Sequence, residues 1–295
     1  MYAFRSSGPE PSRRRWHPFL DDERYLEARG HRLRVSVEGT GPPLLLINGL
    51  AANIELWRPL RDLLPARQTI AFDPPGIGGS PASPDQLWLT DLADIVDGLL
   101  SQVAYDGVDV LGYSFGGALA QQLARQYPQR VRRLVLAATI PGLGAIQNPL
   151  VLMRLVQLAM QPPGPAQTVA VARAMGGRVS QDVRIRAEIE RMHRSQPLNR
   201  AGVIRQLLAM TGWSSIPWLH TIRAPTLVLV AGADPIVPQV NGRILMSRLP
   251  ARTGHLVPDA GHLFLIDQAE DVAGVIEGFL ESAEFLPADQ ESPRS

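Results

Sequence analysis

The sequence predicts an α/β fold: a mostly parallel β-sheet with helices on both faces and an inserted helical cap. Continuous apolar runs, which are typical of parallel strands buried on both faces, occur at 43–48, 68–73, 131–138 and 225–231. Helix-forming segments separate most of these runs, and such alternation is typical of a parallel sheet. Between about residues 139 and 215 no convincing strand pattern occurs, so we expect a helical insertion there.

The expected strands make up an eight-stranded type of sheet. The first two, 25–30 and 31–37, are expected to form an antiparallel hairpin, because apolar and polar residues alternate in the second. The other strands are expected at 43–48, 68–73, 107–111, 131–138 and 225–231, with a weaker one near 255–257. Helices are expected at 54–64, 90–103, 118–125 and 267–280, with Thr90 and Asp267 as N-caps.

These elements divide the chain into a core, a cap and two tails. We expect the core over residues 23–140 and 216–285, and the helical cap, or lid, over residues 141–215. Residues 1–22 and 286–295 are poor in apolar side chains and are expected to be disordered tails. The first tail holds the cluster Arg13–Arg15, which is either a contact for an anionic surface or, as we favour, simply solvated.

The composition excludes several classes of function. The 295 residues include no cysteine, which rules out disulfides, thiol catalysis and thiolate metal sites. A net charge of +1 does not point to nucleic acid as a partner. No apolar run reaches the ~18–20 residues of a transmembrane helix, and the charged N-terminus lacks the apolar region of a secretory signal. We expect a cytoplasmic protein that needs neither a metal nor a cofactor.

The motif Gly112-Tyr113-Ser114-Phe115-Gly116 is the strongest functional signal. It reads Gly-x-Ser-x-Gly directly after a strand and before a helix. This is the context of a serine displayed on a strained turn, which we call the elbow. Side chains at 112 and 116 would clash in such a turn, which explains the two glycines. The Phe115 amide would lie at a helix N-terminus and serve as an oxyanion donor. A chance match in a glycine-rich loop is the alternative, and the flanking strand and helix argue against it.

A nucleophilic serine needs a general base and an acid that orients the base. Among the six histidines we assign His262, which lies between the last strand and the last helix, where loops at the carboxyl ends of parallel strands converge. Asp234, directly after the strand 225–231, is the expected acid. A second oxyanion donor is expected in the loop after Ile47, at the Leu50 amide.

Methionine is concentrated in the insertion. Five of the seven methionines lie there, at 153, 160, 175, 192 and 210, and the segment 150–160 is apolar on nearly all sides. Such side chains suit a surface that accepts varied apolar ligands, but ordinary helix packing, which is compatible with that role, is the explanation we favour. We keep Met153 as a candidate for substrate binding.

The chain resembles the α/β-hydrolase superfamily over almost its whole length, and the order Ser114, Asp234, His262 is that of this superfamily. More narrowly, it is similar to the intracellular depolymerases of medium-chain-length polyhydroxyalkanoates. The similarity is carried by Asn48-Gly49 and the stretches 72–80, 116–122 and 212–220, the last reading Gly-Trp-Ser-Ser-Ile-Pro-Trp-Leu-His. Phe115 stands where that group is expected to have tryptophan, and the cap matches it poorly.

The resemblance implies a serine esterase that hydrolyses aliphatic polyesters of 3-hydroxyacids through an acyl-enzyme. It also implies a cytoplasmic location at polyester storage granules. Residues around the elbow and in the cap would bind the substrate, and we assign this role to Asn48, Gly49, Met153, Trp213 and Trp218. Hydrolysis of small esters or of carbon–carbon bonds by the same residues is the first alternative. A non-catalytic ligand-binding module of the same fold is the second. The oligomeric state is left open.

Overall fold

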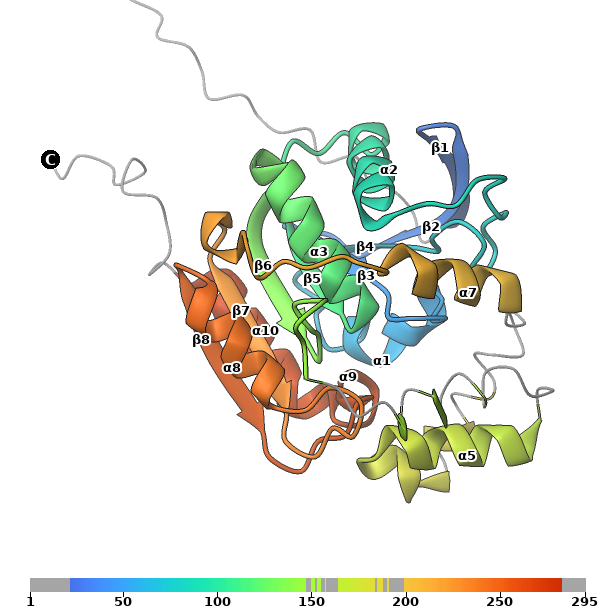
Figure 1. Ribbon diagram of the computed structural model, residues 1–295. Helices are drawn as coiled ribbons and strands as arrows, with labels where there is room; N and C mark the ends of the chain where they lie inside the picture. The colour runs from blue at the N-terminus through green and yellow to red at the C-terminus, as the bar shows by residue number, and fades with distance from the viewer. Residues whose placement is uncertain are drawn as a thin grey trace, which may run out of the picture.

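The computed structural model describes residues 22–146, 150, 151, 153, 154, 157, 164–183, 185–187, 190 and 199–282. Eight strands form one sheet in the order β1-β2-β4-β3-β5-β6-β7-β8 (Figure 1). They are β1 (Asp22–Ala28), β2 (His31–Glu38), β3 (Pro43–Ile47), β4 (Gln68–Phe72), β5 (Val108–Tyr113), β6 (Val131–Ala137), β7 (Thr226–Ala231) and β8 (Arg252–Val257). β1 and β2 pair antiparallel with each other, and β2 pairs antiparallel with β4, whereas the pairs from β4 to β8 are parallel. The predicted fold class is therefore confirmed.

The sheet is covered by helices on both faces, as Figure 1 shows. α2 (Leu89–Gln102), α3 (Phe115–Gln126) and α8 (Val240–Arg248) share one buried apolar cluster with the sheet. On the other face lie α1 (Arg58–Arg61), α9 (Phe264–Asp267) and α10 (Ala269–Glu281). Short 3-10 helices occur at η1 (Ile54–Trp57), η2 (Pro128–Arg130), η3 (Arg178–Ser180) and η4 (Leu219–Thr221).

The central strands supply side chains to both clusters, because successive residues of a strand point to opposite faces. In β3, Leu45 and Ile47 belong to the cluster under α2 and α3, whereas Leu44 and Leu46 belong to the cluster under α1 and α10. All five residues of β3 are buried. This two-sided burial is the physical reason why the central strands read as continuous apolar runs.

Two predicted N-caps and one predicted continuous helix are wrong. α2 begins at Leu89 and its N-cap is Trp88 rather than Thr90, because the Trp88 amide donates to Asp91 Oδ2 at 2.8 Å. α10 begins after Gln268, and Asp267, the predicted N-cap, instead ends α9. The helix predicted over 54–64 is divided into η1 and α1, and a proline near the start of α1 lacks the N–H that one continuous helix would need.

The chain between β6 and β7 holds α5 (Pro165–Met175), η3 and α7 (Arg200–Ala209) among its described residues. Figure 1 shows α7 at the right-hand side of the molecule and α5 below it. An isolated bridge pairs Gly142 with Ser214 and so joins the two ends of this insertion. The division into core, cap and tails stays a prediction.

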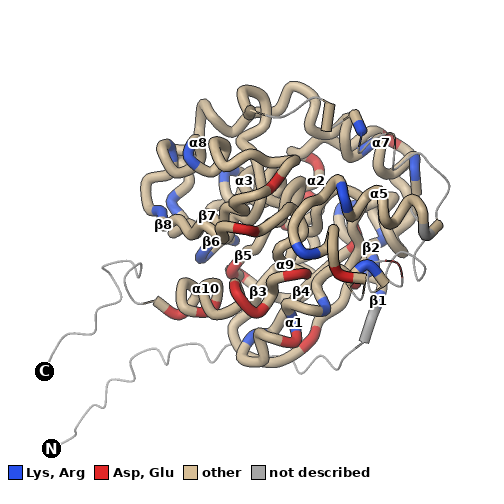
Figure 2. Tube along the Cα trace, turned by 90° about the horizontal axis from the view of Figure 1, so that it is seen from below, with Lys and Arg blue, Asp and Glu red and all other residues tan. Residues whose placement is uncertain are grey.

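The charged residues are spread over the chain. Figure 2 shows basic and acidic residues interspersed along the described part of the tube, which agrees with the net charge of +1. Within the described part of the chain, no helix is long and apolar enough to span a bilayer.

Candidate active site

Ser114 stands on the turn between β5 and α3, in a backbone conformation that residues with side chains rarely adopt (φ 53°, ψ −117°). The glycines on either side are required by this turn. A Cβ on Gly112 would lie 2.4 Å from the carbonyl oxygen of Gly116, and one on Gly116 would lie 2.1 Å from that of Ile47. The steric reason inferred from the sequence for these two glycines therefore holds.

His262 lies between Ser114 and Asp234 and is within hydrogen-bond distance of both. Its Nε2 is 3.0 Å from Ser114 Oγ, and its Nδ1 is 2.7 Å from Asp234 Oδ2. Because an ionised carboxylate only accepts hydrogen bonds, Nδ1 donates to Asp234, and neutral Nε2 can accept from the serine hydroxyl. The side chain of Asp234 is fully buried, and its Oδ1 accepts the amides of Ile236 and Val237 at 2.8 and 2.9 Å. The acid therefore has little freedom to turn away from the histidine.

The backbone of His262 is held from two sides. Its amide donates to the carbonyl oxygen of Met175, at the end of α5, at 2.8 Å. Its carbonyl oxygen accepts from the Tyr113 hydroxyl at 2.9 Å. Burial, with a smaller effect of Asp234 and Asp267, raises the pKa of Tyr113 well above its usual value, so this hydroxyl stays a donor. The position of the imidazole is thus set jointly by the core and by the insertion.

The loop after β3 runs beside the serine. A Cβ on Gly49 would lie 3.5 Å from Ser114 Cβ and 2.9 Å from the Tyr113 ring, so this backbone passes close to the nucleophile. Asn48 is buried, and its Nδ2 donates to the carbonyl oxygen of Phe72 at 3.2 Å, which ties the loop to the end of β4. Leu50, the next residue along, is half-buried.

The two tryptophans predicted to bind substrate lie elsewhere. Trp213 Nε1 donates to Gln122 Oε1 at 2.7 Å, and the Arg125 guanidinium stacks 4.8 Å from the centre of the Trp218 ring. Gln122 is more than two helical turns along α3 from Ser114, about 12 Å at the usual rise per residue. The pair Trp213–Trp218, edge to face at 5.9 Å, therefore braces the side of α3. The structure does not bring it to the nucleophile.

Only part of the methionine-rich segment lies among the described residues. Met153 is 53% exposed and Leu150 is 68% exposed. Met160 and Met192 lie outside the described residues. A role for Met153 in substrate binding stays a prediction.

Comparison with known proteins assigns the family. The family described as "alpha/beta hydrolase fold" matches residues 42–269. The chain belongs to the α/β hydrolase family.

A poly(3-hydroxyalkanoate) depolymerase from Ectopseudomonas oleovorans is 38% identical to this hydrolase over 265 residues, covering 88% of this chain and 92% of the relative. A pimeloyl-[acyl-carrier protein] methyl ester esterase from Aromatoleum aromaticum is 28% identical and covers 80% of this chain and 97% of the relative. The enol-lactonase structure from Burkholderia xenovorans shares the fold, with a TM-score of 0.77, 21% identity, and coverage of 88% and 100%.

Sequence reasoning missed two residues that support the site of this α/β hydrolase. Asp73, fully buried after β4, accepts the Ile54 amide through Oδ1 and the Gly79 amide through Oδ2, both at 2.9 Å, and Arg34 at 3.1 Å. It therefore joins the loops that follow β3 and β4, and an aspartate directly after an apolar strand was a signal that could have been used. Gln206 on α7 accepts the Ala51 amide at 2.9 Å, and no local pattern marks it.

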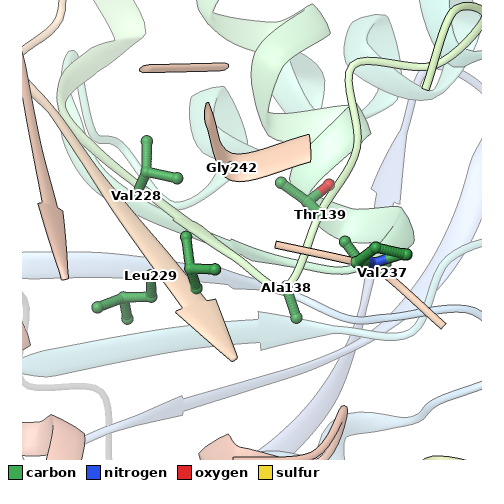
Figure 3. A pocket seen from close by; sticks show the side chains of 8 residues that line it. Ala138, Thr139, Val228, Leu229, Val237 and Gly242 are labelled. Atoms are coloured by element: carbon green, nitrogen blue, oxygen red, sulfur yellow. The ribbon is translucent and has the colours of Figure 1, made fainter. Parts of the chain in front are cut away.

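A small pocket lies next to this hydrolase site and is not a substrate pocket. Figure 3 shows it between the ends of β6 and β7 and α8, lined by Ala138, Thr139, Val228, Leu229, Val230, Val237, Pro238 and Gly242. Its cavity volume, about 10 Å³, is enough for one water molecule. Among the described residues no group of three or more His, Asp or Glu side chains is arranged to hold a metal ion.

Proposed function

We propose that the protein is a serine esterase that hydrolyses aliphatic polyesters of 3-hydroxyacids. The observation that carries the chemistry is the pair of hydrogen bonds made by His262, 3.0 Å to Ser114 and 2.7 Å to Asp234. The substrate class is supported by the 38% identity to a poly(3-hydroxyalkanoate) depolymerase over most of both chains.

In the proposed reaction Ser114 Oγ attacks the ester carbonyl carbon while His262 Nε2 takes the hydroxyl proton. Asp234 keeps the imidazole in the productive tautomer and stabilises its positive charge. The protonated His262 then gives the proton to the departing alcohol oxygen, which leaves an acyl-enzyme. Water then attacks the acyl carbon while His262 Nε2 takes its proton. The bond between Ser114 Oγ and the acyl carbon breaks, His262 returns the proton to Oγ, and the acid leaves.

The charge that develops on the carbonyl oxygen needs donors. The Phe115 amide, at the first residue of α3, is one proposed donor because N-terminal amides of a helix lack partners within the helix. The Leu50 amide, in the loop that passes Ser114 at Gly49, is the other. Removing one such donor typically raises the barrier by about 3–4 kcal/mol.

The proposed substrate also indicates a location for the enzyme. A long aliphatic polyester is insoluble, so the enzyme would work at the surface of polyester storage granules in the cytoplasm. The insertion with α5 and α7 would be the cap under which the chain is fed, because its described part contacts both the histidine loop and the β3 loop.

The first experiment removes the nucleophile. We expect Ser114→Ala to lower the release of 3-hydroxyacids from medium-chain polyester by a factor on the order of a million, since triad residues act as a unit. Ser247→Ala, an exposed serine on α8, is the matched control and should keep full activity. Undiminished release by a folded Ser114→Ala variant would contradict the proposal.

Two further measurements separate the alternatives. If the wild type cleaves short p-nitrophenyl esters but releases nothing from polymer, the esterase stands and the polyester assignment fails. If a fluorophosphonate probe does not label Ser114, the non-catalytic alternative is favoured.

A further inference from the structure

Gln206 projects from the insertion onto the loop beside the nucleophile. α7, which carries it, is seated closely on the core, because a Cβ on Gly202 would lie 2.0 Å from the carbonyl oxygen of Gly76. The Gln206 side chain is almost completely buried, with 4% of the residue exposed, and its Oε1 accepts the Ala51 amide at 2.9 Å. The amide is therefore held in one place and one orientation.

The other end of this amide has no partner among the described residues. Because an N–H group must face an acceptor, the bond from Ala51 assigns Oε1 and leaves Nε2, with two hydrogens, on the other side. Nε2 is buried and makes no hydrogen bond within the described part of the chain. A buried donor without an acceptor in the protein calls for an explanation, such as a bound water, an ion or a ligand that supplies the acceptor. Because Gln206 is bonded to the loop beside Ser114, we take the substrate as the source of that acceptor.

The place of Gln206 suits such a ligand. Ala51 is one residue beyond Leu50 and two beyond Gly49, where an added Cβ would lie 3.5 Å from Ser114 Cβ. A polyester of 3-hydroxyacids has a carbonyl oxygen on each side of the ester bond under attack. A plain ester has only the carbonyl that the oxyanion donors already serve.

We propose that Gln206 is a substrate-binding residue whose Nε2 donates a hydrogen bond to the carbonyl oxygen of the ester unit next to the scissile one. This inference rests on the proposed function. Through this hydrogen bond the insertion would favour esters that carry a second carbonyl group next to the scissile one. The Ala51 bond is what points the donor at the substrate, because it prevents the amide from flipping.

The test compares two substrates in two Gln206 variants. One substrate is the methyl ester of a 3-hydroxyacid trimer, whose central ester has a carbonyl on each side, and the other is the methyl ester of a plain fatty acid. Gln206→Met keeps the size and removes the donor. Gln206→Glu keeps an acceptor for Ala51 and replaces the donor by an oxygen. Gln86→Met is the control, because Gln86 Nε2 also donates to α7, at the Arg205 carbonyl oxygen, and its other hydrogen bond among the described residues is to Leu87.

We expect both Gln206 variants to raise the KM for the trimer about tenfold, the value of one hydrogen bond, with the plain-ester KM within about twofold of wild type. Gln86→Met should leave both values unchanged. The inference is overturned if KM rises equally for the two substrates, which is what a purely structural role gives, or if it rises for neither. Thermal melting shows whether Gln206→Met folds, and Gln206→Glu carries the test if it does not.

Failure of the proposed esterase function and failure of the proposed role of Gln206 give different results. If the wild type hydrolyses neither methyl ester, the proposed esterase function itself is wrong. If it hydrolyses the trimer and the Gln206 variants do so with unchanged KM, only the role of Gln206 is lost.

Discussion

Ser114 keeps an unfavourable backbone conformation because its peptide groups are held on both sides. Its amide donates to the Ala137 carbonyl oxygen at 2.9 Å, and its own carbonyl oxygen accepts from Thr139 Oγ1 at 2.6 Å. Strain of this kind persists only where surrounding contacts over-determine it, and it is concentrated at functional sites. β6 and the residues after it therefore support the nucleophile, although they supply no group to the proposed reaction.

Asp73 is the residue whose ionisation should be visible in stability. Burial raises its pKa from 3.8 to about 6, although the Gly79 amide and Arg34 lower it. Since the pKa is higher in the folded than in the unfolded chain, folding favours the protonated form. The contribution to stability is full below pH 4 and is lost as the pH rises to about 6.

We therefore expect the free energy of unfolding of the wild type to fall by about 2 kcal/mol more than that of Asp73→Asn between pH 4 and pH 7. The asparagine cannot ionise, and all other titrating groups are common to the two proteins. Urea unfolding at a series of pH values measures the difference. Parallel pH profiles would show that Asp73 does not titrate in this window.

At the scale of elements, the segment from the end of α5 through η3 acts as a strap over the histidine loop. Met175 accepts the His262 amide at 2.8 Å, and the Val179 amide donates to Asp267 Oδ2 at 2.7 Å. Between these two bonds, Gly177 has φ 66°, and a Cβ there would lie 2.7 Å from the Gly261 amide nitrogen. The strap and the loop are in direct backbone contact.

Gly177→Ala should therefore displace the His262 loop and lower kcat at least tenfold, whereas KM changes little. Gly212→Ala is the matched control, because Gly212 has φ 73° but nothing lies within 4 Å of its Cβ position. The control should lose only about 1 kcal/mol of stability from backbone strain. Steady-state kinetics and urea unfolding of both variants check this. Equal kcat values in the two variants would mean that the strap does not position the histidine.

At the scale of the whole molecule, the proposed site and a buried ion cluster lie at opposite ends of the strands. Ser114, Asp234 and His262 follow the carboxyl ends of β5, β7 and β8. At the amino ends, Arg67 contacts Asp109 at 3.4 Å and Glu277 at 2.9 Å, and Arg132 contacts Asp109 at 3.1 Å. This cluster ties two strands to α10 and is far from the reacting atoms.

Arg67→Met should lower the free energy of unfolding by about 3 kcal/mol, because it leaves buried Asp109 with only one of its two arginines. Arg58→Met, which breaks exposed ion pairs, should cost less than about 1 kcal/mol. Chemical denaturation measures both. The kcat of folded Arg67→Met should equal that of wild type, and a lowered kcat would show that the two ends of the sheet are coupled.

Most of the fold was predictable because its signals are local. An apolar run such as 43–47 is buried on both faces wherever it lies in a parallel sheet, and the elbow glycines follow from the backbone of one turn. Helix ends were less predictable. Thr90 is a good N-cap in isolation, but Asp91 accepts the amide of Trp88, and the N-cap therefore lies two residues before Thr90. The contacts of Trp213 and Trp218 with α3 were not predictable, because they depend on how the insertion returns to the core.

The sequence by itself determined the α/β fold and the three residues that meet at the elbow, because strand periodicity, turn sterics and chain order are properties of short segments. Only the tertiary structure decided that Met175 supports the His262 backbone, that Asp73 joins two loops and that Gln206 reaches Ala51. The contacts of Met175 and Gln206 join segments far apart in the chain, and they depend on how the insertion packs on the core. Those of Asp73 depend on how the loops after β3 and β4 meet. Local patterns do not record which segments pack together.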